Sequence, residues 1–201
     1  MEIIPLIYVK NRKIYTEKEG KPVSLDEVLE QMDEEDSIYF LDIDGIEKNK
    51  PNLCTYQRIT EKQDIWVDAG PRVLGDVVDL IMAGANRITI RNNLFPMEEI
   101  PNIKEVTENM IYTVVELRNE KERMFSFSPL PGVDGLVFFS DKKQIEMDFK
   151  TGELFRTLCN KYKVYAAEAD RKNSSYWEKM GATGILLDFK IAKNWVNRDV
   201  F

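Results

Sequence analysis

Short runs of apolar residues recur along the chain at fairly regular intervals, and most are followed by a stretch with helical spacing. The runs that predict strands cover residues 3–9, 37–46, 65–70, 87–93, 110–119, 135–140, 162–169 and 182–189. Nearly continuous apolar runs are typical of parallel strands covered on both faces. Eight such strands alternating with helices predict an α/β fold, a (β/α)8 TIM barrel that forms a single domain over residues 1–201.

Residues between the runs mark where helices and turns begin and end. Ser24 and Glu27 form a capping box, which predicts a helix extending to about residue 36. Gly84 is expected to end a helix. Residues 11–23 predict a small hairpin, and Pro101 is expected to break the segment in which it lies.

The chain is short for this fold, which typically needs about 250 residues. No convincing helix lies between the fifth and sixth predicted strands, where the sequence is rich in proline and glycine. We therefore expect a trimmed barrel that lacks its fifth helix. An open, flavodoxin-like sheet is the main alternative.

An internal repeat supports a fold of two similar halves. In each half a short apolar run ends in small or acidic residues, and a helical stretch, Gly-Ala and another apolar run follow. Ile65 aligns with Val164, a shift of 99 residues, and Gly84 aligns with Gly181, a shift of 97 residues. A repeat of this length predicts two half-barrels, each a series of βα units.

The composition of the chain limits the partners and the catalytic groups that are possible. The net charge of −7 argues against nucleic acid as the main partner, and no apolar run approaches the roughly 20 residues that cross a bilayer. With no histidine and only Cys54 and Cys159, the common zinc sites and histidine-dependent triads are excluded. Acid–base chemistry must then use Asp, Glu, Lys, Tyr or Cys. Two isolated thiols fit a reducing compartment, so a cytoplasmic location is expected.

Several segments together resemble the histidine-biosynthesis barrels, namely the ribotide (ProFAR) isomerase and its cyclase relative, with the isomerase the nearer of the two. They are IPLIYVKNRKIY (4–15), YFLDIDGI (39–46), VDAGPR (67–72), AGANRITI (83–90) and MGATGILL (180–187). The resemblance spans nearly the whole chain. It implies a duplicated half-barrel, an isomerase-type reaction on an aminosugar phosphate, and a phosphate bound at each end of the substrate, with no cofactor.

In that family, two aspartates at the ends of strands one and five act as base and acid. The internal repeat places Tyr8 at the first position and Glu116 at the second. Tyrosine has an ordinary pKa near 10 and is a poor base at neutral pH, whereas Glu116 could act as acid or base if partly buried. We therefore expect a reaction other than the histidine-pathway isomerisation. The alternative is that Tyr8 fills the barrel mouth and Glu116 is solvated.

The second predicted strand ends in two carboxylates that match a motif of the same family. Strand alternation is expected to send Asp42 and Asp44 to one side and Ile43 to the other. Side chains at the carboxyl ends of barrel strands face the pocket, so a catalytic role is predicted for Asp42 or Asp44. Alternatively, Asp44 caps the following turn.

The two phosphate sites implied by the resemblance are altered. Near the first, only Gly70 and Arg72 of the glycine-rich run remain, beside Asp68, and Arg91 replaces a small residue after strand four. Gly70 with Arg72 could anchor an anion, with Arg91 helping. Alternatively, Arg91 could fill the vacated anion site or pair with Asp68.

At the second site, Glu168 and Asp188 replace small residues, and carboxylates repel phosphate. One phosphate or none is therefore expected. The sequence leaves open whether a divalent cation binds among these carboxylates; no resident metal is predicted.

Two functions follow from these expectations. The first is an isomerase- or lyase-type enzyme acting on a small phosphorylated or otherwise anionic molecule, with family-level suggestions of coenzyme biosynthesis. The second is a non-catalytic ligand-binding or subunit-type barrel. Absence of the fifth helix would bare an apolar flank, so a homodimer is predicted, with contacts from Phe125, Phe127, Leu130 and Pro131.

Overall fold

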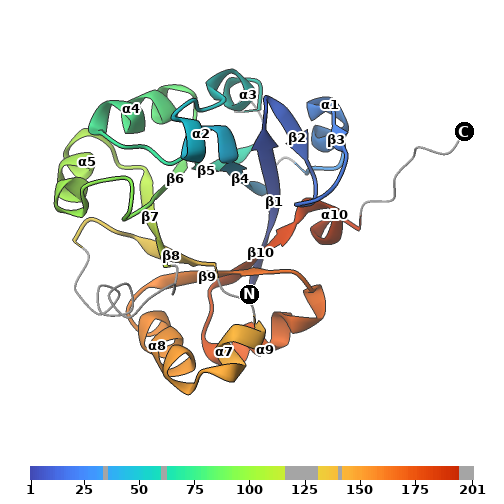
Figure 1. Ribbon diagram of the computed structural model, residues 1–201, viewed down its shortest axis with the longest axis vertical. Coiled ribbons are helices and arrows are strands. Elements are labelled where there is room, and N and C mark those ends of the chain that lie inside the picture. The colour runs from blue at the N-terminus through green and yellow to red at the C-terminus, as the bar shows by residue number, and fades with distance from the viewer. Residues whose placement is uncertain (34–35, 60–62, 116–130, 140–141, 195–201) are drawn as a thin grey trace, which may run out of the picture.

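Eight parallel strands close into a ring in the computed structural model, which describes residues 1–33, 36–59, 63–115, 131–139 and 142–194 (Figure 1). Each strand pairs with the next, and the last pairs with the first. The fold is the predicted (β/α)8 barrel, not an open sheet. Its strands are β1 (Glu2–Lys10), β4 (Ser37–Asp42), β5 (Asp64–Asp68), β6 (Arg87–Ile90), β7 (Met110–Val115), β8 (Gly135–Phe138), β9 (Lys163–Glu168) and β10 (Gly184–Asp188).

A small hairpin extends the first strand beyond the ring. Strand β2 (Lys13–Tyr15) pairs antiparallel with β1, and β3 (Pro22–Val23) pairs antiparallel with β2, which confirms the hairpin predicted for residues 11–23. The β1–β2 turn consists of Asn11 and Arg12, which both have positive φ angles, 52° and 60°. This is the turn type that suits the twist of a two-residue hairpin.

Helices surround the ring and cover its outer face (Figure 1). They are α1 (Leu25–Leu29), α2 (Ile43–Lys48), α3 (Leu53–Gln57), α4 (Leu74–Met82), η1 (Met97–Glu99), α5 (Ile100–Val106), α7 (Lys142–Met147), α8 (Phe149–Cys159), η2 (Arg171–Asn173), α9 (Ser174–Met180) and α10 (Phe189–Ala192). Outward-facing apolar residues of the strands pack against these helices in two clusters. None of the described helices is long and apolar enough to cross a membrane.

The inside of the ring holds a third cluster with an unusual share of aromatic residues. It contains Ile4, Leu6, Tyr39, Trp66, Tyr112, Val137, Tyr165 and Leu186. The Trp66 ring lies 4.1 Å from Tyr112 and 4.9 Å from Tyr165, centroid to centroid. Such contacts fill the barrel with side chains, so ligand chemistry is confined to its ends.

Several predicted boundaries differ in the structure. Helix α1 has the predicted capping box at Ser24 and Glu27 but is already complete at Leu29. Pro101 does not break a helix; it lies in the first turn of α5, where its missing N–H needs no partner. The segment in which the fifth helix was expected to be missing, 116–130, lies outside the described residues.

The repeat corresponds to equivalent positions in the ring. Strands β5 and β9, which carry the two copies, are the third and seventh strands of the barrel. Gly84 and Gly181 both follow the helix after their strand, with φ angles of 97° and 94°. Glycine adopts this left-handed conformation without strain, which explains why both copies keep it.

Candidate functional site at the mouth of the barrel

The carboxyl ends of the strands form a partly exposed mouth above the buried interior. Side chains alternate along a strand, so a residue two positions beyond a member of the interior cluster also faces inward. The inward-facing residues of the mouth are found in this way: Tyr8 lies two positions beyond Leu6, Leu41 beyond Tyr39, Phe139 beyond Val137, and Asp188 beyond Leu186. The mouth comprises Tyr8, Leu41, Arg91, Phe139, Ala167 and Asp188, each of intermediate exposure. A small ligand could reach these side chains, whereas the layer beneath is sealed.

Tyr8 and Asp188 form a hydrogen-bonded pair on neighbouring strands of the mouth. The Tyr8 hydroxyl donates to Asp188 Oδ1 over 2.7 Å. Burial raises the pKa of the Asp188 carboxyl above its ordinary value, although hydrogen bonds from Tyr8 and from the Lys18 backbone N–H oppose the rise. Burial and the Asp188 charge raise the pKa of Tyr8, so Tyr8 stays protonated. Asp188 is therefore a candidate acid or base at the mouth.

The loop between β2 and β3 is joined to the same edge of the mouth. The Lys190 ammonium group contacts Glu17 Oε1 at 2.9 Å, and the Lys190 backbone N–H donates to the Thr16 carbonyl. Figure 1 shows this hairpin beside α10 and next to β1. Asp188 is thus enclosed by the hairpin on one side and open to the mouth on the other.

Asp68 and Arg91 form a second polar unit in the mouth. Arg91 donates from Nε to Asp68 Oδ1 over 2.9 Å and from Nη2 to Oδ2 over 2.7 Å. The Asp68 side chain is fully buried and that of Arg91 is 11% exposed. The Arg91 guanidinium lies 5.6 Å from the centre of the Phe139 ring. The pairing of Arg91 with Asp68, one of the alternatives that the sequence left open, is present.

Asp42 faces away from the mouth, contrary to expectation. It follows Phe40, which packs in the outer cluster, and its carboxylate accepts from the Gly45 N–H, the Asn52 N–H and the Tyr56 hydroxyl. Asp42 therefore ties the end of β4 to α2 and α3. Its side chain is fully buried among these partners, which leaves it no contact with a ligand in the mouth.

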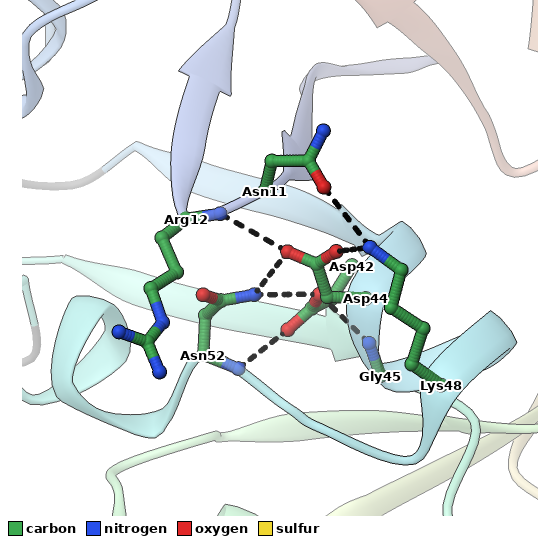
Figure 2. Close-up of polar contacts among 7 residues, drawn as sticks. All are labelled: Asn11, Arg12, Asp42, Asp44, Gly45, Lys48 and Asn52. Atoms are coloured by element: carbon green, nitrogen blue, oxygen red, sulfur yellow. Dashed lines mark hydrogen bonds and ion pairs between the residues drawn. The ribbon is translucent and has the colours of Figure 1, made fainter.

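Asp44 does not continue the strand, so the predicted alternation with Asp42 is wrong. Helix α2 starts at Ile43 because Asp42 caps it, and Asp44 lies in its first turn (Figure 2). Asp44 accepts from Lys48 at 2.8 Å, from the Arg12 N–H at 3.1 Å and from Asn52 at 3.4 Å. Burial acts to raise the pKa of Asp44, but these hydrogen bonds outweigh it and hold the pKa well below the ordinary value.

Gly70 and Arg72 hold the segment after β5 against α2. Arg72 donates to the carbonyl oxygens of Gly45, Ile46 and Gly70 and to Asn49 Oδ1. A Cβ on Gly70, whose φ is 61°, would lie 2.8 Å from Leu94 Cδ1 and 2.9 Å from the Ile46 Cα. Arg72 thus binds the carbonyl groups of α2 and its flanks, and an anion would have to compete with them.

Backbone amides at two strand ends are occupied by the protein's own carboxylates. Glu168 points outward and accepts from the Ala169 and Asp170 N–H groups, at 2.7 and 3.1 Å, and from Trp177 Nε1 at 2.7 Å. Asp76 accepts from the N–H groups of Arg72 and Val73 at the start of α4. Free backbone amides of this kind suit a phosphate, but these already bind carboxylates of the protein. Within the described residues, side chains are therefore better placed than these amides to bind a phosphate.

The described residues contain no group of three or more His, Cys, Asp or Glu side chains arranged to hold a metal ion. Asp42 and Glu168 instead point outward from their strands, Asp188 faces the mouth, and Asp44 lies in α2. Glu116, the predicted acid or base, lies outside the described residues. Tyr39 and Thr89, which join Asp68 inside the barrel, are not predicted as site residues by the sequence motifs. The signal for them was a polar residue at an inward-facing position of a predicted strand.

Comparison with known proteins agrees with this architecture. No family model matches the chain, and no curated protein sequence matches it. Solved structures do: 3-hexulose-6-phosphate synthase from Salmonella typhimurium has a TM-score of 0.59 at 13% identity, covering 84% of this chain and 87% of that one. Phosphoribosyl anthranilate isomerase from Thermococcus kodakaraensis has a TM-score of 0.59 at 12% identity, covering 88% and 95%.

A third structure, a putative dihydrodipicolinate synthetase from Pseudomonas aeruginosa, also has a TM-score of 0.59, at 9% identity, covering 94% of this chain and 71% of that one. The chain has the TIM-barrel fold. At these identities the likeness extends to the fold alone. None of these three structures is a histidine-biosynthesis barrel, so that finer resemblance stays a prediction.

Proposed function

We propose that the chain is an enzyme that moves a proton on a small anionic, sugar-phosphate-like substrate at the mouth of the barrel, in a reaction of isomerase or lyase type. Asp188 acts as the acid or base, Tyr8 holds it and contacts the substrate, and Arg91 attracts the anionic group. Glu116 stays a predicted second acid or base.

The observation that carries this proposal is the placement of Asp188. Among the candidate carboxylates that lie within the described residues, Asp42 and Glu168 point outward into the helices, Asp44 is bound by Lys48, and Asp68 is buried beneath Arg91. Asp188 faces the mouth, is partly exposed and has only Tyr8 as a side-chain hydrogen-bond partner among the described contacts. Its raised pKa brings it closer to neutral pH, where proton transfer is most efficient.

Two further points support an anionic substrate. Arg91 gives the mouth a cationic side chain that is partly exposed beside the apolar ring of Phe139. Two of the structural neighbours, the hexulose-phosphate synthase and the phosphoribosyl anthranilate isomerase, carry phosphorylated sugars in their names. A barrel of the same fold with the Arg91 cation at its mouth would suit a phosphorylated sugar.

Turnover by an Asp188 variant tests the proposal. The protein is assayed for isomerisation and cleavage of ribose 5-phosphate and of aminosugar phosphates. On a substrate that is turned over, Asp188→Asn is expected to lower kcat by about 10²- to 10⁴-fold, the usual contribution of a positioned acid or base. Asp79→Asn, on the exposed face of α4, is the matched control and should leave kcat unchanged. Full activity of Asp188→Asn would contradict the proposal.

A non-catalytic barrel remains the second candidate, favoured by the tyrosine at the strand-one position and by the internally bonded amides near Glu168. It predicts binding of a phosphorylated ligand that Asp188→Asn leaves intact, with no turnover of any substrate tested. The homodimer predicted from the sequence fits either function. A monomer in size-exclusion chromatography at micromolar concentration would contradict the dimer.

A further inference from the structure

A chain of hydrogen-bonded side chains crosses the barrel interior and ends at Asp68. Trp66 Nε1 donates to Thr89 Oγ1 over 2.8 Å, the Thr89 and Tyr39 hydroxyl groups lie 3.3 Å apart, and the Tyr39 hydroxyl donates to Asp68 Oδ2 over 3.0 Å. The four residues come from three adjacent strands, β4, β5 and β6. All four are buried.

Within this series of hydrogen bonds, every donor points toward the Asp68 carboxylate. An indole N–H can only donate, and an ionised carboxylate can only accept. Tyr39 has a single proton, which goes to Asp68, so its oxygen accepts from the Thr89 hydroxyl. Burial and the Asp68 charge raise the pKa of Tyr39 far above its ordinary value, which keeps that proton in place.

Arg91 is held by Asp68 at the end of this series of hydrogen bonds. Two parallel N–H bonds to Asp68 fix the plane of the guanidinium, and the Phe139 ring lies 5.6 Å from its centre. Such an arrangement is poorly explained by stability alone, because a buried ion pair is often no more stabilising than apolar packing. The interior of this fold is usually filled by aliphatic side chains instead.

We infer that Arg91 binds the anionic group of the substrate and that Trp66, Thr89, Tyr39 and Asp68 are positioning residues that fix its orientation. This inference rests on the proposed function, which it deepens by assigning the anion subsite to strands three and four. Asp188 lies on strand eight, so the reacting carbon and the anionic group would be at different sides of the mouth.

The test uses the Nε–H signal of Arg91 in ¹⁵N spectra, with inorganic phosphate, ribose 5-phosphate and ribose as probes. Both phosphates are expected to shift this signal, and ribose is not. Arg91→Lys should weaken ribose 5-phosphate binding by about 10-fold or more, because lysine cannot donate two parallel N–H bonds to a pair of phosphate oxygens as arginine can. Ribose binding should not change.

Thr89→Val interrupts the chain without touching Arg91, and Thr157→Val on the surface of α8 is its control. We expect Thr89→Val to weaken ribose 5-phosphate binding several-fold while ribose binding is unaffected; a purely structural role would weaken both equally. Tyr39→Phe should repeat the result if Thr89→Val fails to fold. The inference is overturned if phosphate leaves the Arg91 signal unmoved, or if Arg91→Lys binds ribose 5-phosphate normally. The turnover of Asp188→Asn judges the proposed function separately.

Discussion

At the scale of single residues, the direction in which a strand sends a carboxylate decides its role. Asp42 and Glu168 face the helices and satisfy backbone N–H groups, whereas Asp68 and Asp188 face the barrel interior. Buried carboxylates persist only where such partners offset the loss of water. The sequence predicted acidic residues at these strand ends but could not separate the two classes, because the register of each strand end depends on the helix that follows.

Asp44 provides a prediction on stability. Its pKa is lowered in the folded protein, so it stabilises the fold fully above its unfolded pKa, near 4, and this contribution is lost as the pH falls through the folded value. At pH 7, Asp44→Asn is expected to reduce the free energy of unfolding by about 1.5–3 kcal/mol, the range for hydrogen bonds to a charged group. Urea unfolding across the pH range measures it.

The difference between Asp44→Asn and the parent should shrink below about pH 4, because the parent carboxylate is then losing its charge. Asp79→Asn is the matched control and should change stability little at any pH. A pH-independent difference would show that the charge of Asp44 does not matter.

Tyr8 gives a prediction with a definite sign. Its hydroxyl stabilises the charged form of Asp188, so removing the hydroxyl in Tyr8→Phe should raise the pKa of Asp188 further. Carboxyl ¹³C chemical shifts followed over pH measure this value directly. A pKa that falls in the variant would mean that the hydrogen bond does not act on the carboxylate.

At the scale of elements, the apolar runs predicted every strand of the barrel. The residues at which the strands end were predicted less well. The run 37–46 looked like one strand because Ile43 and Ile46 continue its apolar pattern. The structure ends β4 at Asp42, whose side chain caps α2. A local hydrogen bond thus overrides the apolar pattern. Because the helix starts at Ile43, Asp44 lies in α2 and contacts the β1–β2 turn instead of the expected pocket.

The close packing of α2 on the loop after β5 gives a prediction with a built-in control. A Cβ on Gly45 would lie 2.4 Å from the Ala69 carbonyl oxygen, while one on Gly75 in α4 would meet nothing within 4 Å. Gly45→Ala is expected to destabilise by about 1–3 kcal/mol through overpacking. Gly75→Ala should stabilise by about 0.4–1 kcal/mol, since it favours the helix. Thermal unfolding compares them, and equal effects would contradict the packing described.

At the scale of the whole molecule, the repeat in the sequence correctly predicted a closed barrel with equivalent third and seventh strands. It could not predict the chain of Trp66, Thr89, Tyr39 and Asp68, because these contacts join three strands across the interior. The sequence predicted catalytic roles for Tyr8, Asp42, Asp44 and Glu116. Asp42 faces the helices, Asp44 lies in α2 and is bound by Lys48 and the Arg12 N–H, and Glu116 is outside the described residues, whereas Tyr8 lies at the mouth. Asp188, which the sequence predicted as a substrate-binding residue that repels phosphate and not as an acid or base, lies at the mouth beside Tyr8.

The central claim is that a small phosphorylated molecule is processed at the mouth between Asp188 and Arg91. A crystal structure of the protein soaked with ribose 5-phosphate tests it most directly. The account predicts the ligand at the carboxyl ends of the strands, with its phosphate on Arg91 and its sugar within hydrogen-bond distance of Asp188 or Tyr8. A ligand bound at the opposite end of the barrel or on the outer helices, or an empty mouth at millimolar ligand, would contradict it.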